Sequence, residues 1–566
     1  MQIREQLEEI VNQAIAAAIA EGALALDEVP AAALERPRDP ENGDWASTVA
    51  MRSAKLAHAN PRDIAQAIVA HLPENDVVKS AEIAGPGFIN FRLTEQALQG
   101  VVARVREERG DYGRGEVADG PKNVNLEYIS ANPTGPMHVG HGRWAALGDS
   151  MARVMRHAGY DVYEEFYVND HGTQMDVFGN SIAVRYMQEL GHDAEMPEEC
   201  YGGAYVTDIA RGIIEREGNK YEGLSDDERR LAFREIGMHE MLGNQRTLLE
   251  KFGTTFDKWF SERDLYVEDA DGETAVSRAL AAMDAKGYVY EKDDATWFAS
   301  SEFGDDKDRV LIKANGELTY FTSDMAYHYN KVQRGFDHLI DLWGADHHGY
   351  IKRCEAMMEA WGYTGLLEVV LGQLVNLLRD GEPVRMSKRT GEMVTFEELV
   401  DEVGVDATRF LMLSRSSDQA VDFDIEVAKK QDSTNPVYYV QYAHARICSI
   451  LRKAAGDDSA ADELARRVVP EGVDLSVLTH GSELALMRKM DDFGELIALA
   501  ARDRAPYRLT HYAQELASLF HQFYTNCHII GEEQAVQDAR LALADATRIL
   551  LALTLDLLGV SAPERM

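Results

Sequence analysis

The spacing of apolar residues divides the chain into stretches of different character. Near the N-terminus, apolar residues recur at helical spacing over residues 1–22, 61–72 and 94–108, and a strand pattern covers 77–83. A helix repeats its buried face every three or four residues, whereas a strand alternates buried and exposed positions. We therefore predict an N-terminal α+β domain over residues 1–115.

A polar, glycine-rich segment at 110–120, GDYGRGEVADG, predicts the end of this domain. The chain then reads as a strand (VNLEYI), a loop (SANPTGPM), a long helix that begins with HVGHGR, and a second strand (VYEEFYV). A strand, a crossover helix and a second strand form a βαβ unit, which places the two strands parallel in one sheet. We predict a Rossmann-like parallel-sheet domain over residues 120–395.

The rest of the chain completes a predicted multidomain α/β organisation. Residues 180–310 are charged and helical in pattern, so we expect them to form an insertion before strand candidates at 338–344 and 367–378. Beyond these strands, helical periodicity continues nearly to the end of the chain and includes the sequence DFD at 422–424. This pattern predicts an all-α helix bundle over residues 396–566.

Composition narrows the class of protein. Of the 566 residues, 45% are hydrophobic and 27% are charged, as in folded globular proteins. The sequence has no run of about 18 apolar residues and no signal-peptide core, so we expect a cytoplasmic protein without a membrane partner. The four cysteines form no C-x-x-C pair, and we expect free thiols and no metal site. The net charge of −38 argues against general nucleic-acid affinity, although one face can still be basic.

The junction between the SANPTGPM loop and the long helix is a candidate nucleotide site. Beyond the carboxyl end of a parallel strand, the first turn of a helix offers unpaired N–H groups to an anion. His138 and His141 share one helix face, so both can donate to one phosphate group. Gly140 and Gly142 would let a nucleotide approach the backbone closely. A short H-x-G-H sequence is weak evidence alone, and the flanking strand and helix are what favour this interpretation.

A second polar loop, DGEPVRMSKRTGEMVTF at 380–396, carries Arg385, Lys388 and Arg389. Taken alone, such a loop is usually a solvated basic segment. Together with the upstream histidines, it can instead form a mobile cationic arm that closes over a triphosphate.

The pair HVGH and RMSK resembles the HIGH and KMSKS signatures of class I aminoacyl-tRNA synthetases. Six further segments narrow the resemblance to arginyl-tRNA synthetases, and they occur in that family's order over nearly the entire chain: DWASTVAMRSAKLA, AGPGFINF, NLEYISANPTGPMHVGHGR, YFTSDMAYHYNK, NPVYYVQYAHAR and LLGVSAPERM. Arg385 stands where the second signature has lysine, and Arg389 stands where many relatives of other specificities have serine. Lys388 keeps the position that is expected to contact phosphate.

The resemblance implies a ligase that condenses L-arginine with ATP to arginyl-adenylate and pyrophosphate. The arginine would then pass to the 3′-terminal adenosine of tRNA(Arg), releasing AMP, with Mg²⁺ accompanying the ATP. It implies catalytic roles for His138, His141 and Lys388, and ATP contacts from Gly140, Gly142, Met386, Ser387 and Lys388. The HIGH-type motif would comprise Asn132, Pro133, Thr134, Gly135, Pro136, Met137, His138, Val139, Gly140, His141 and Gly142.

Arginine places a specific demand on its binding site, because its guanidinium group stays charged and offers five donors in a planar fork. The resemblance implies that Glu127, Tyr320 and Asp324 contact the guanidinium group, and that Asn132 and His348 lie near the α-amino group. Without the resemblance, Glu127 reads as an exposed acid at a strand end and Tyr320 as an aromatic residue of a sheet.

The resemblance also implies two distant contacts with tRNA. The N-terminal domain would meet the tRNA elbow through Phe88 and Asn90, although Phe88 could equally be a core residue. The helical C-terminal domain would bind the anticodon, with basic and aromatic residues that suit an RNA face. Among these residues are Tyr438, Tyr439, Tyr442 and Arg446. We expect the protein to act as a monomer.

Two alternatives remain open at this point. The sequence ADHHG at 345–349 could mark a metal-dependent phosphoesterase, which would need further aspartates clustered after early strands. A noncatalytic tRNA-binding protein is the second alternative, although such a protein would have no use for both signatures together with Glu127 and Asp324.

Overall fold

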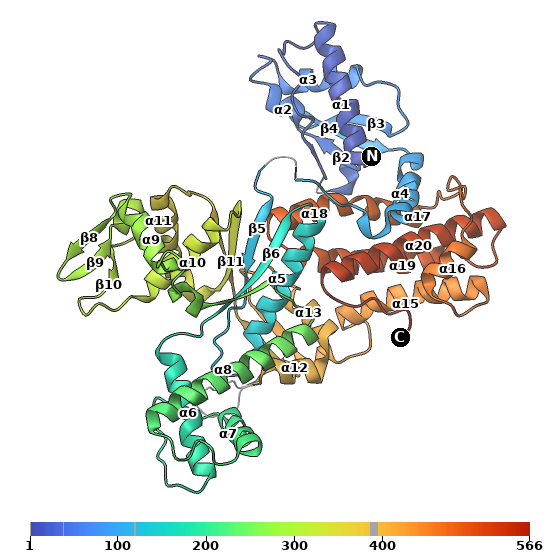
Figure 1. The fold of residues 1–566 in the computed structure, drawn as a ribbon. Coiled ribbons are helices and arrows are strands. Elements are labelled where there is room, and N and C mark those ends of the chain that lie inside the picture. The colour runs from blue at the N-terminus through green and yellow to red at the C-terminus, as the bar shows by residue number, and fades with distance from the viewer. Residues whose placement is uncertain (1, 38, 118–119, 385–393) are drawn as a thin grey trace.

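A central parallel sheet organises the chain, and the other parts extend from it in different directions (Figure 1). In that view the N-terminal domain lies at the top and the C-terminal helices lie on the right. The computed structural model describes residues 2–37, 39–117, 120–384 and 394–566.

The N-terminal domain contains an antiparallel sheet in the order β1-β2-β4-β3. Its elements are α1 (Ile3–Ala20), β1 (Leu34–Glu35), β2 (Trp45–Ser47), α2 (Val49–Ser53), α3 (Pro61–Ala70), β3 (Val78–Ala84), β4 (Phe88–Leu93) and α4 (Glu95–Glu108). Asn60 caps α3, because its side chain accepts a hydrogen bond from the backbone of Arg62, and Pro61 suits the first helical position. The helices and the β3 strand predicted for this region are confirmed to within two residues at each end.

Five parallel strands in the order β12-β11-β5-β6-β7 form the central sheet. They are β5 (Asn123–Glu127), β6 (Asp161–Val168), β7 (Lys258–Ser261), β11 (His338–Gly344) and β12 (Leu367–Gly372). The helix α5 (Val139–His157) connects β5 to β6, so the predicted βαβ unit is confirmed. Two further helices flank β11 in the chain: α10 (Tyr320–Gln333) and α11 (Ile351–Trp361).

Three helices inserted between β6 and β7 pack around a core of their own. They are α6 (Thr173–Glu189), α7 (Ala204–Glu217) and α8 (Asp226–Lys251). After β7, the chain forms α9 (Ala275–Asp284) and a small antiparallel sheet of β8 (Val289–Lys292), β9 (Ala295–Phe298) and β10 (Arg309–Ile312). The expectation of one helical stretch over 180–310 is therefore wrong beyond α8. Strands of four residues are too short for their alternation to stand out in the sequence.

A second correction concerns the segments on either side of residues 385–393. These residues carry the RMSK sequence, and we call them the RMSK loop. The strand candidate at 367–378 divides into β12 and β13 (Val375–Arg379), and β13 pairs with β14 (Glu382–Pro383) and β15 (Val421–Asp424). The expectation that DFD lies in a helical region is wrong. Val421 and Phe423 are buried while Asp422 is exposed, which is strand alternation that an isolated four-residue segment does not reveal.

The C-terminal part is a bundle of helices, as predicted. The helices after the RMSK loop are α12 (Phe396–Val403), α13 (Val405–Met412), α14 (Ile425–Ala428), α15 (Pro436–Ala455), α16 (Ala461–Val468), α17 (Gly481–Asp491), α18 (Phe493–Arg502), α19 (Tyr507–Asn526) and α20 (Gln534–Leu557). Buried apolar residues of the N-terminal domain, the central sheet and this bundle form one continuous core. The predicted fold class, a multidomain α/β protein with an N-terminal α+β domain and a C-terminal all-α bundle, is confirmed.

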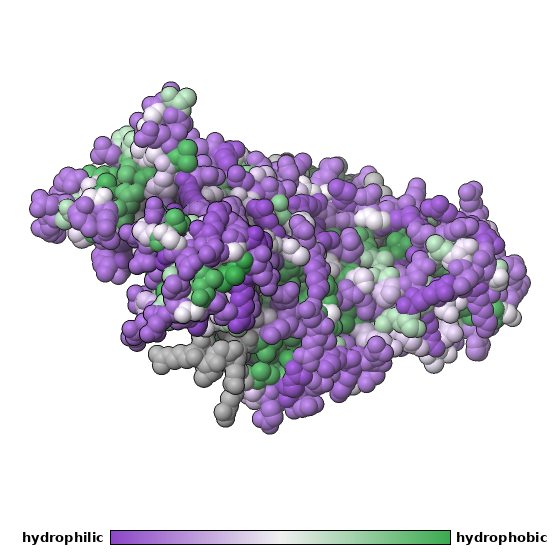
Figure 2. Space-filling view, turned by 60° about the horizontal axis from the view of Figure 1, so that its bottom comes forward, coloured by the Kyte–Doolittle hydropathy of each residue, from purple (hydrophilic) through white to green (hydrophobic). Residues whose placement is uncertain are grey.

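The surface of the molecule is largely hydrophilic. Polar side chains dominate the face in Figure 2, and the apolar ones gather in small groups between them. Within the described ranges, no helix is long and apolar enough to cross a membrane.

Candidate active site

His138 and His141 lie together at the start of α5. His138 is the N-cap residue of this helix, and its backbone N–H donates to Nδ1 of His141 at 3.0 Å. The two imidazole rings stack with their centroids 3.7 Å apart. Both side chains are half-buried, so this pair combines with the positive end of the helix dipole at one partly open position. Such an arrangement suits an anionic ligand.

The chain returns to this position immediately after the RMSK loop. Thr395 forms a β-bridge with His138, and the backbone N–H of Phe396 donates to the carbonyl of Met137 at 2.9 Å. A Cβ atom on Gly142 would lie 2.4 Å from the Phe396 ring. Gly142 therefore has a structural reason to be glycine, since α12 packs directly against α5 at this point. The contact of Gly142 with adenosine stays a prediction.

Three of the predicted ATP-binding residues belong to the RMSK loop. Met386, Ser387 and Lys388 lie outside the described residues. The segments on either side are described, namely β14 before the loop and Thr395 after it. The contact between Thr395 and His138 brings the chain that follows this loop beside the first signature.

Arg143, one residue beyond the first signature, fixes α5 to the chain around β13 and β15. Its guanidinium group is fully buried and donates to four backbone carbonyls: those of Gln373, Leu374, Ser416 and Gln419, at 2.6 to 3.3 Å. Burial lowers the pKa of Arg143 to about 10, so the side chain remains protonated near neutral pH. A cation whose terminal nitrogens donate to four backbone carbonyls acts as a structural tie between segments distant in sequence.

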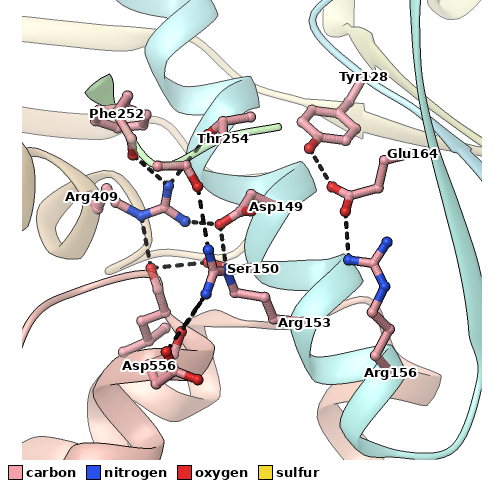
Figure 3. A network of polar contacts seen from close by, with 12 residues as sticks. Tyr128, Asp149, Ser150, Arg153, Arg156, Glu164, Phe252, Thr254, Arg409 and Asp556 are labelled. Atoms are coloured by element: carbon pink, nitrogen blue, oxygen red, sulfur yellow. Dashed lines mark hydrogen bonds and ion pairs between the residues drawn. The ribbon is translucent and has the colours of Figure 1, made fainter. Parts of the chain in front are cut away.

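A second buried arginine ties α5 to the C-terminal helices (Figure 3). Arg409 of α13 donates to the Asp149 carboxylate on α5 and to the carbonyls of Phe252 and Leu558, both at 2.9 Å. Arg153, one turn beyond Asp149, donates to the same carboxylate at 2.8 Å. Breaking such a buried ion pair leaves an uncompensated charge and is strongly destabilising. The position of α5 therefore depends on contacts from the insertion, from α13 and from the end of α20.

The backbone is strained where β5 leaves the sheet. Ile129 and Ser130 have φ values of 70° and 46°, and both are in the left-handed region that non-glycine residues avoid. For a β-branched residue such as Ile129 this conformation is rare. Strained residues of this kind persist only where surrounding contacts hold them, and they cluster at functional sites.

Three carboxylates lie at paired positions on three neighbouring strands of the central sheet. Glu127 on β5 is paired in register with Asp341 on β11 and with Glu165 on β6. We call these three residues the carboxylate row. Like charges at facing positions repel each other, so the row requires compensating cations.

Two cations on α10 compensate the carboxylate row. The fully buried Lys331 donates to Glu127 at 2.6 Å and to Asp341 at 2.8 Å, and Arg334 makes a bidentate ion pair with Glu165 at 2.6 and 2.9 Å. Three carboxylates thus face two permanent cations, and His328 contacts Asp341 as a further partner. Although burial lowers the pKa of His328, its bond to Asp341 raises that pKa overall, so the row is close to charge balance.

Asp324, also on α10, adds a further carboxylate to this region. It accepts a hydrogen bond from the Tyr350 hydroxyl, while its backbone carbonyl contacts His328 Nδ1 at 2.8 Å. The opposite nitrogen of His328 contacts Asp341 at 3.0 Å. Burial raises the pKa of Asp324 to about 6, and the nearby charge of Glu127 adds to this shift. A bound cation would stabilise the ionised form and reverse the shift.

The other predicted arginine-binding residues lie on exposed edges of the same region. Tyr320 is the first residue of α10, is 78% exposed and stands one turn before Asp324. Asn132 is exposed and donates to the side-chain oxygen of Gln174 at 3.0 Å. His348 is exposed and lies in the same short 3-10 helix as Tyr350.

The residues that contact Glu127 and Asp324 were not predicted from the sequence. Lys331, His328 and Asp341 were not predicted, nor was Tyr350. One signal was present, because HLIDLWG places an aspartate in the middle of an otherwise apolar strand. A charge in such a position is almost always paired when it is buried.

Phe88 and Asn90 share one face of β4. Ile89, Phe91 and Leu93 are buried, while Phe88 and Asn90 are only half-buried and point to the opposite face. Phe88 is therefore not part of the domain core. Its ring remains available for a stacking contact.

An open aromatic groove lies between α15 and α19. It has a volume of about 530 Å³ and is lined by Ser433, Tyr438, Tyr439, Tyr442, Arg446 and His521. The rings of Tyr438 and Tyr442 are nearly parallel, with an angle of 11° and centroids 6.2 Å apart. The Arg446 guanidinium lies over Tyr524, 4.4 Å from the ring centroid. We call this site the aromatic groove.

Comparison with protein families accounts for almost the entire chain. Residues 5–93 match the arginyl tRNA synthetase N terminal domain, residues 110–448 match the class I (R) tRNA synthetase catalytic domain, and residues 440–566 match the DALR anticodon binding domain. The arginine–tRNA ligase of Heliobacterium modesticaldum is 45% identical over 565 residues, covering 100% of this chain and 99% of that protein. This chain belongs to the arginyl-tRNA synthetase family.

Other members of the arginyl-tRNA synthetase family give the same result. The arginine–tRNA ligase of Moorella thermoacetica is 45% identical over 566 residues, with 100% and 99% of the two chains covered. The Thermus thermophilus arginyl-tRNA synthetase structure superposes with a TM-score of 0.73 over 100% of both chains at 22% identity, which shows a shared fold. The resemblance drawn from the sequence is confirmed, and family membership argues against the phosphoesterase alternative.

Proposed function

We propose that this chain activates L-arginine with ATP to arginyl-adenylate and then transfers the arginine to the 3′-terminal adenosine of tRNA(Arg), releasing AMP and pyrophosphate. The observation that carries this proposal is the match with arginine–tRNA ligases over the full length of the chain. The carboxylates Glu127 and Asp324, together with the histidine pair at the start of α5, add a physical reason, because the two groups suit a cation and an anion respectively.

The activation step requires positioning and charge stabilisation more than a strong base. The arginine carboxylate is already ionised at neutral pH and can attack the α-phosphate of ATP directly. His138 and His141 would donate to the phosphates from the helix start, and Lys388 would stabilise charge on the departing pyrophosphate. Gly140 and Gly142 would border the adenosine. In addition, Met386 and Ser387 would contact ATP from the RMSK loop.

The arginine side chain would bind as a cationic partner of Glu127 and Asp324. Because Glu127 already accepts hydrogen bonds from Lys331 and Ser130, it has fewer free lone pairs for the substrate than Asp324. Asp324 would therefore be the main anchor of the guanidinium group, with Glu127 and the exposed ring of Tyr320 beside it. Nearer the α-amino group of arginine, we expect Asn132 and His348.

tRNA would contact the chain at both ends. In the N-terminal domain, proposed for residues 1–115, Phe88 and Asn90 would meet the tRNA elbow through stacking and hydrogen bonding. The helical domain, proposed for residues 396–566, would hold anticodon bases in the aromatic groove, where nearly parallel tyrosine rings and Arg446 suit stacking. The two sites flank the catalytic domain proposed for residues 120–395.

Three finer features complete the proposal. Mg²⁺ would enter as the MgATP complex, since Mg²⁺ is usually held by substrate phosphates with few protein ligands. The chain would act as a monomer, because the proposed sites all lie within one copy. The proposed tRNA substrate implies a cytoplasmic location.

Arginine-dependent ATP–pyrophosphate exchange in the presence of tRNA(Arg) tests the proposal. We expect His138→Ala to lower the activation rate by about 10²-fold or more, because a donor to the transition state is lost, while tRNA affinity stays nearly unchanged. His192→Ala is the matched control, since that histidine is exposed on the insertion. tRNA binding without any exchange in the unmodified protein would instead support the noncatalytic alternative.

A further inference from the structure

Helices of the insertion contact the loop that leads into the first signature. We call residues 130–137 the signature loop. The Tyr205 hydroxyl on α7 donates to the carbonyl of Thr134 at 2.8 Å. The side-chain amide of Gln245 on α8 donates to the carbonyls of Asn132 at 3.2 Å and Gly135 at 3.5 Å. Two side chains of the insertion thus donate hydrogen bonds to three backbone carbonyls of the loop.

These contacts are buried and closely fitted. Thr134 is 7% exposed and Gln245 is 3% exposed. A Cβ atom on Gly135 would lie only 3.1 Å from the Tyr205 hydroxyl, so the loop and the α7 side chain approach more closely than most side chains allow. Buried carbonyls that lose their donors pay the full cost of desolvation, so these hydrogen bonds constrain the loop strongly.

The signature loop needs such external support. Pro133 and Pro136 have no N–H groups, so the loop can form few hydrogen bonds of its own. At its start, Ile129 and Ser130 have positive φ values, which cost energy unless the surroundings hold them. The loop leads directly into His138, which is the N-cap residue of α5 and stacks on His141.

We propose that the inserted helices brace the signature loop, and that Tyr205 and Gln245 are positioning residues for adenylate formation. This inference rests on the proposed function. The two side chains act through the loop backbone, which sets the position of His138 relative to the arginine region. A displacement of about 1 Å at a reacting centre can cost about 10²-fold in rate, so a small relaxation of the loop is sufficient to slow activation.

The first test compares two tyrosines whose hydroxyl groups each donate to a backbone carbonyl, one in the signature loop and one within the insertion. Tyr186 on α6 donates to the carbonyl of Gly218 at 2.8 Å, within the insertion itself. Tyr205→Phe and Tyr186→Phe therefore each remove one hydroxyl-to-carbonyl hydrogen bond of equal length, and Tyr186→Phe also removes a longer one that the hydroxyl accepts from the Tyr221 N–H at 3.4 Å. We expect Tyr205→Phe to lower the rate of adenylate formation per active site by about 10-fold, and Tyr186→Phe to leave that rate unchanged.

The second test uses two glutamines. The side-chain amide of Gln99 on α4 donates to two backbone carbonyls, of Ser476 at 3.4 Å and Leu478 at 3.2 Å, and the residue is 8% exposed. Gln99→Met is therefore the control for Gln245→Met, which keeps the side-chain size but removes the donor. We expect only Gln245→Met to slow activation, again by about 10-fold.

Single-turnover rates should be measured on the full-length protein after titration of active sites. A purely structural defect lowers the fraction of active sites but leaves the rate per site unchanged, whereas mispositioning lowers the rate per site. The inference is overturned if each variant matches its control in rate per site. Exchange by the unmodified protein is measured first, because its absence would refute the proposed function itself, before any variant is compared.

Discussion

The carboxylate row with the neighbouring Asp324, and the aromatic groove, are both proposed to bind a substrate, but they are built in opposite ways. The row consists of buried charges whose partners, such as Lys331, come from the protein itself. The groove is open, and Tyr442 in its wall is 41% exposed. Charges removed from water interact strongly and tolerate little change, whereas exposed rings contribute modest and separable amounts.

This difference matches the two proposed ligands. A small cation such as the arginine side chain can be selected only by a few well-placed charges, because its surface is small. A large RNA can be held by several weak contacts. We therefore expect substitutions in the row to have large, coupled effects, and substitutions in the groove to have smaller, independent effects.

The largest effect is expected for Lys331→Met. Removal of this buried cation leaves Glu127 without its cationic partner and Asp341 with only His328, which should lower the free energy of unfolding by about 3–5 kcal/mol. Denaturant titration measures this change. Lys352→Met is the control, because Lys352 pairs with Glu355 at the surface with 71% of its side chain exposed, and we expect no measurable change. Equal stability of the two variants would contradict the buried-charge account.

Asp324→Asn is expected to have the next largest effect. It keeps the side-chain size but removes one charge from the proposed guanidinium site, so arginine activation should fall by roughly 2–4 kcal/mol in terms of kcat/KM. Discrimination against citrulline, which lacks the positive charge, should shrink as well. ATP–pyrophosphate exchange with both amino acids measures the two effects. If neither changed, Glu127 would have to be tested as the main anchor.

A smaller effect is expected in the aromatic groove. Tyr442→Ala should weaken tRNA(Arg) binding by about 1–3 kcal/mol, the contribution of one base stacked on an aromatic ring, without altering arginine activation. Filter binding and exchange assays separate the two outcomes. Tyr363→Ala is a suitable control, because Tyr363 is 36% exposed but lies just beyond α11, away from the groove. An equal loss of tRNA affinity in both variants would remove the groove from the proposed tRNA interface.

The smallest effect is a pH dependence that should separate the two regions. The pKa of Asp324 is raised to about 6, and only its ionised form attracts a guanidinium group. The kcat/KM for arginine should therefore fall as the pH drops below 6, by about tenfold per pH unit. Asp324→Asn should abolish this dependence, whereas Tyr442→Ala should leave it unchanged. Persistence of the same acid limb in Asp324→Asn would assign it to another group, such as Glu262, whose pKa burial raises to about 7.

Much of the architecture could be predicted from the sequence because its elements are long and periodic. The helix α5 and the strands β5, β6 and β11 follow directly from apolar spacing. The prediction failed where segments are short, as in the four-residue strands β7 to β10 and β15. Such strands exist because neighbouring strands supply their hydrogen bonds, and that information is not local.

The active-site residues divide in the same way. His138 and His141 could be found because their proposed function requires close spacing at the start of one helix, which the sequence displays directly. The partners of Glu127 could not be found, because Lys331 and Asp341 are more than 200 residues away and meet it only through strand pairing and the packing of α10. The bracing side chains Tyr205 and Gln245 have no distinguishing pattern in the sequence at all.

The sequence by itself determined which segments become helices and strands, where the two signatures lie and which family the chain resembles. These properties depend on local spacing and on residue types, and both are written along the chain. Only the tertiary structure decided how charges are balanced: it opposed three carboxylates across neighbouring strands and set His328, Lys331 and Arg334 against them from α10 and its C-terminal cap. Electrostatic energy depends on distance and burial, and neither is fixed until the chain has folded.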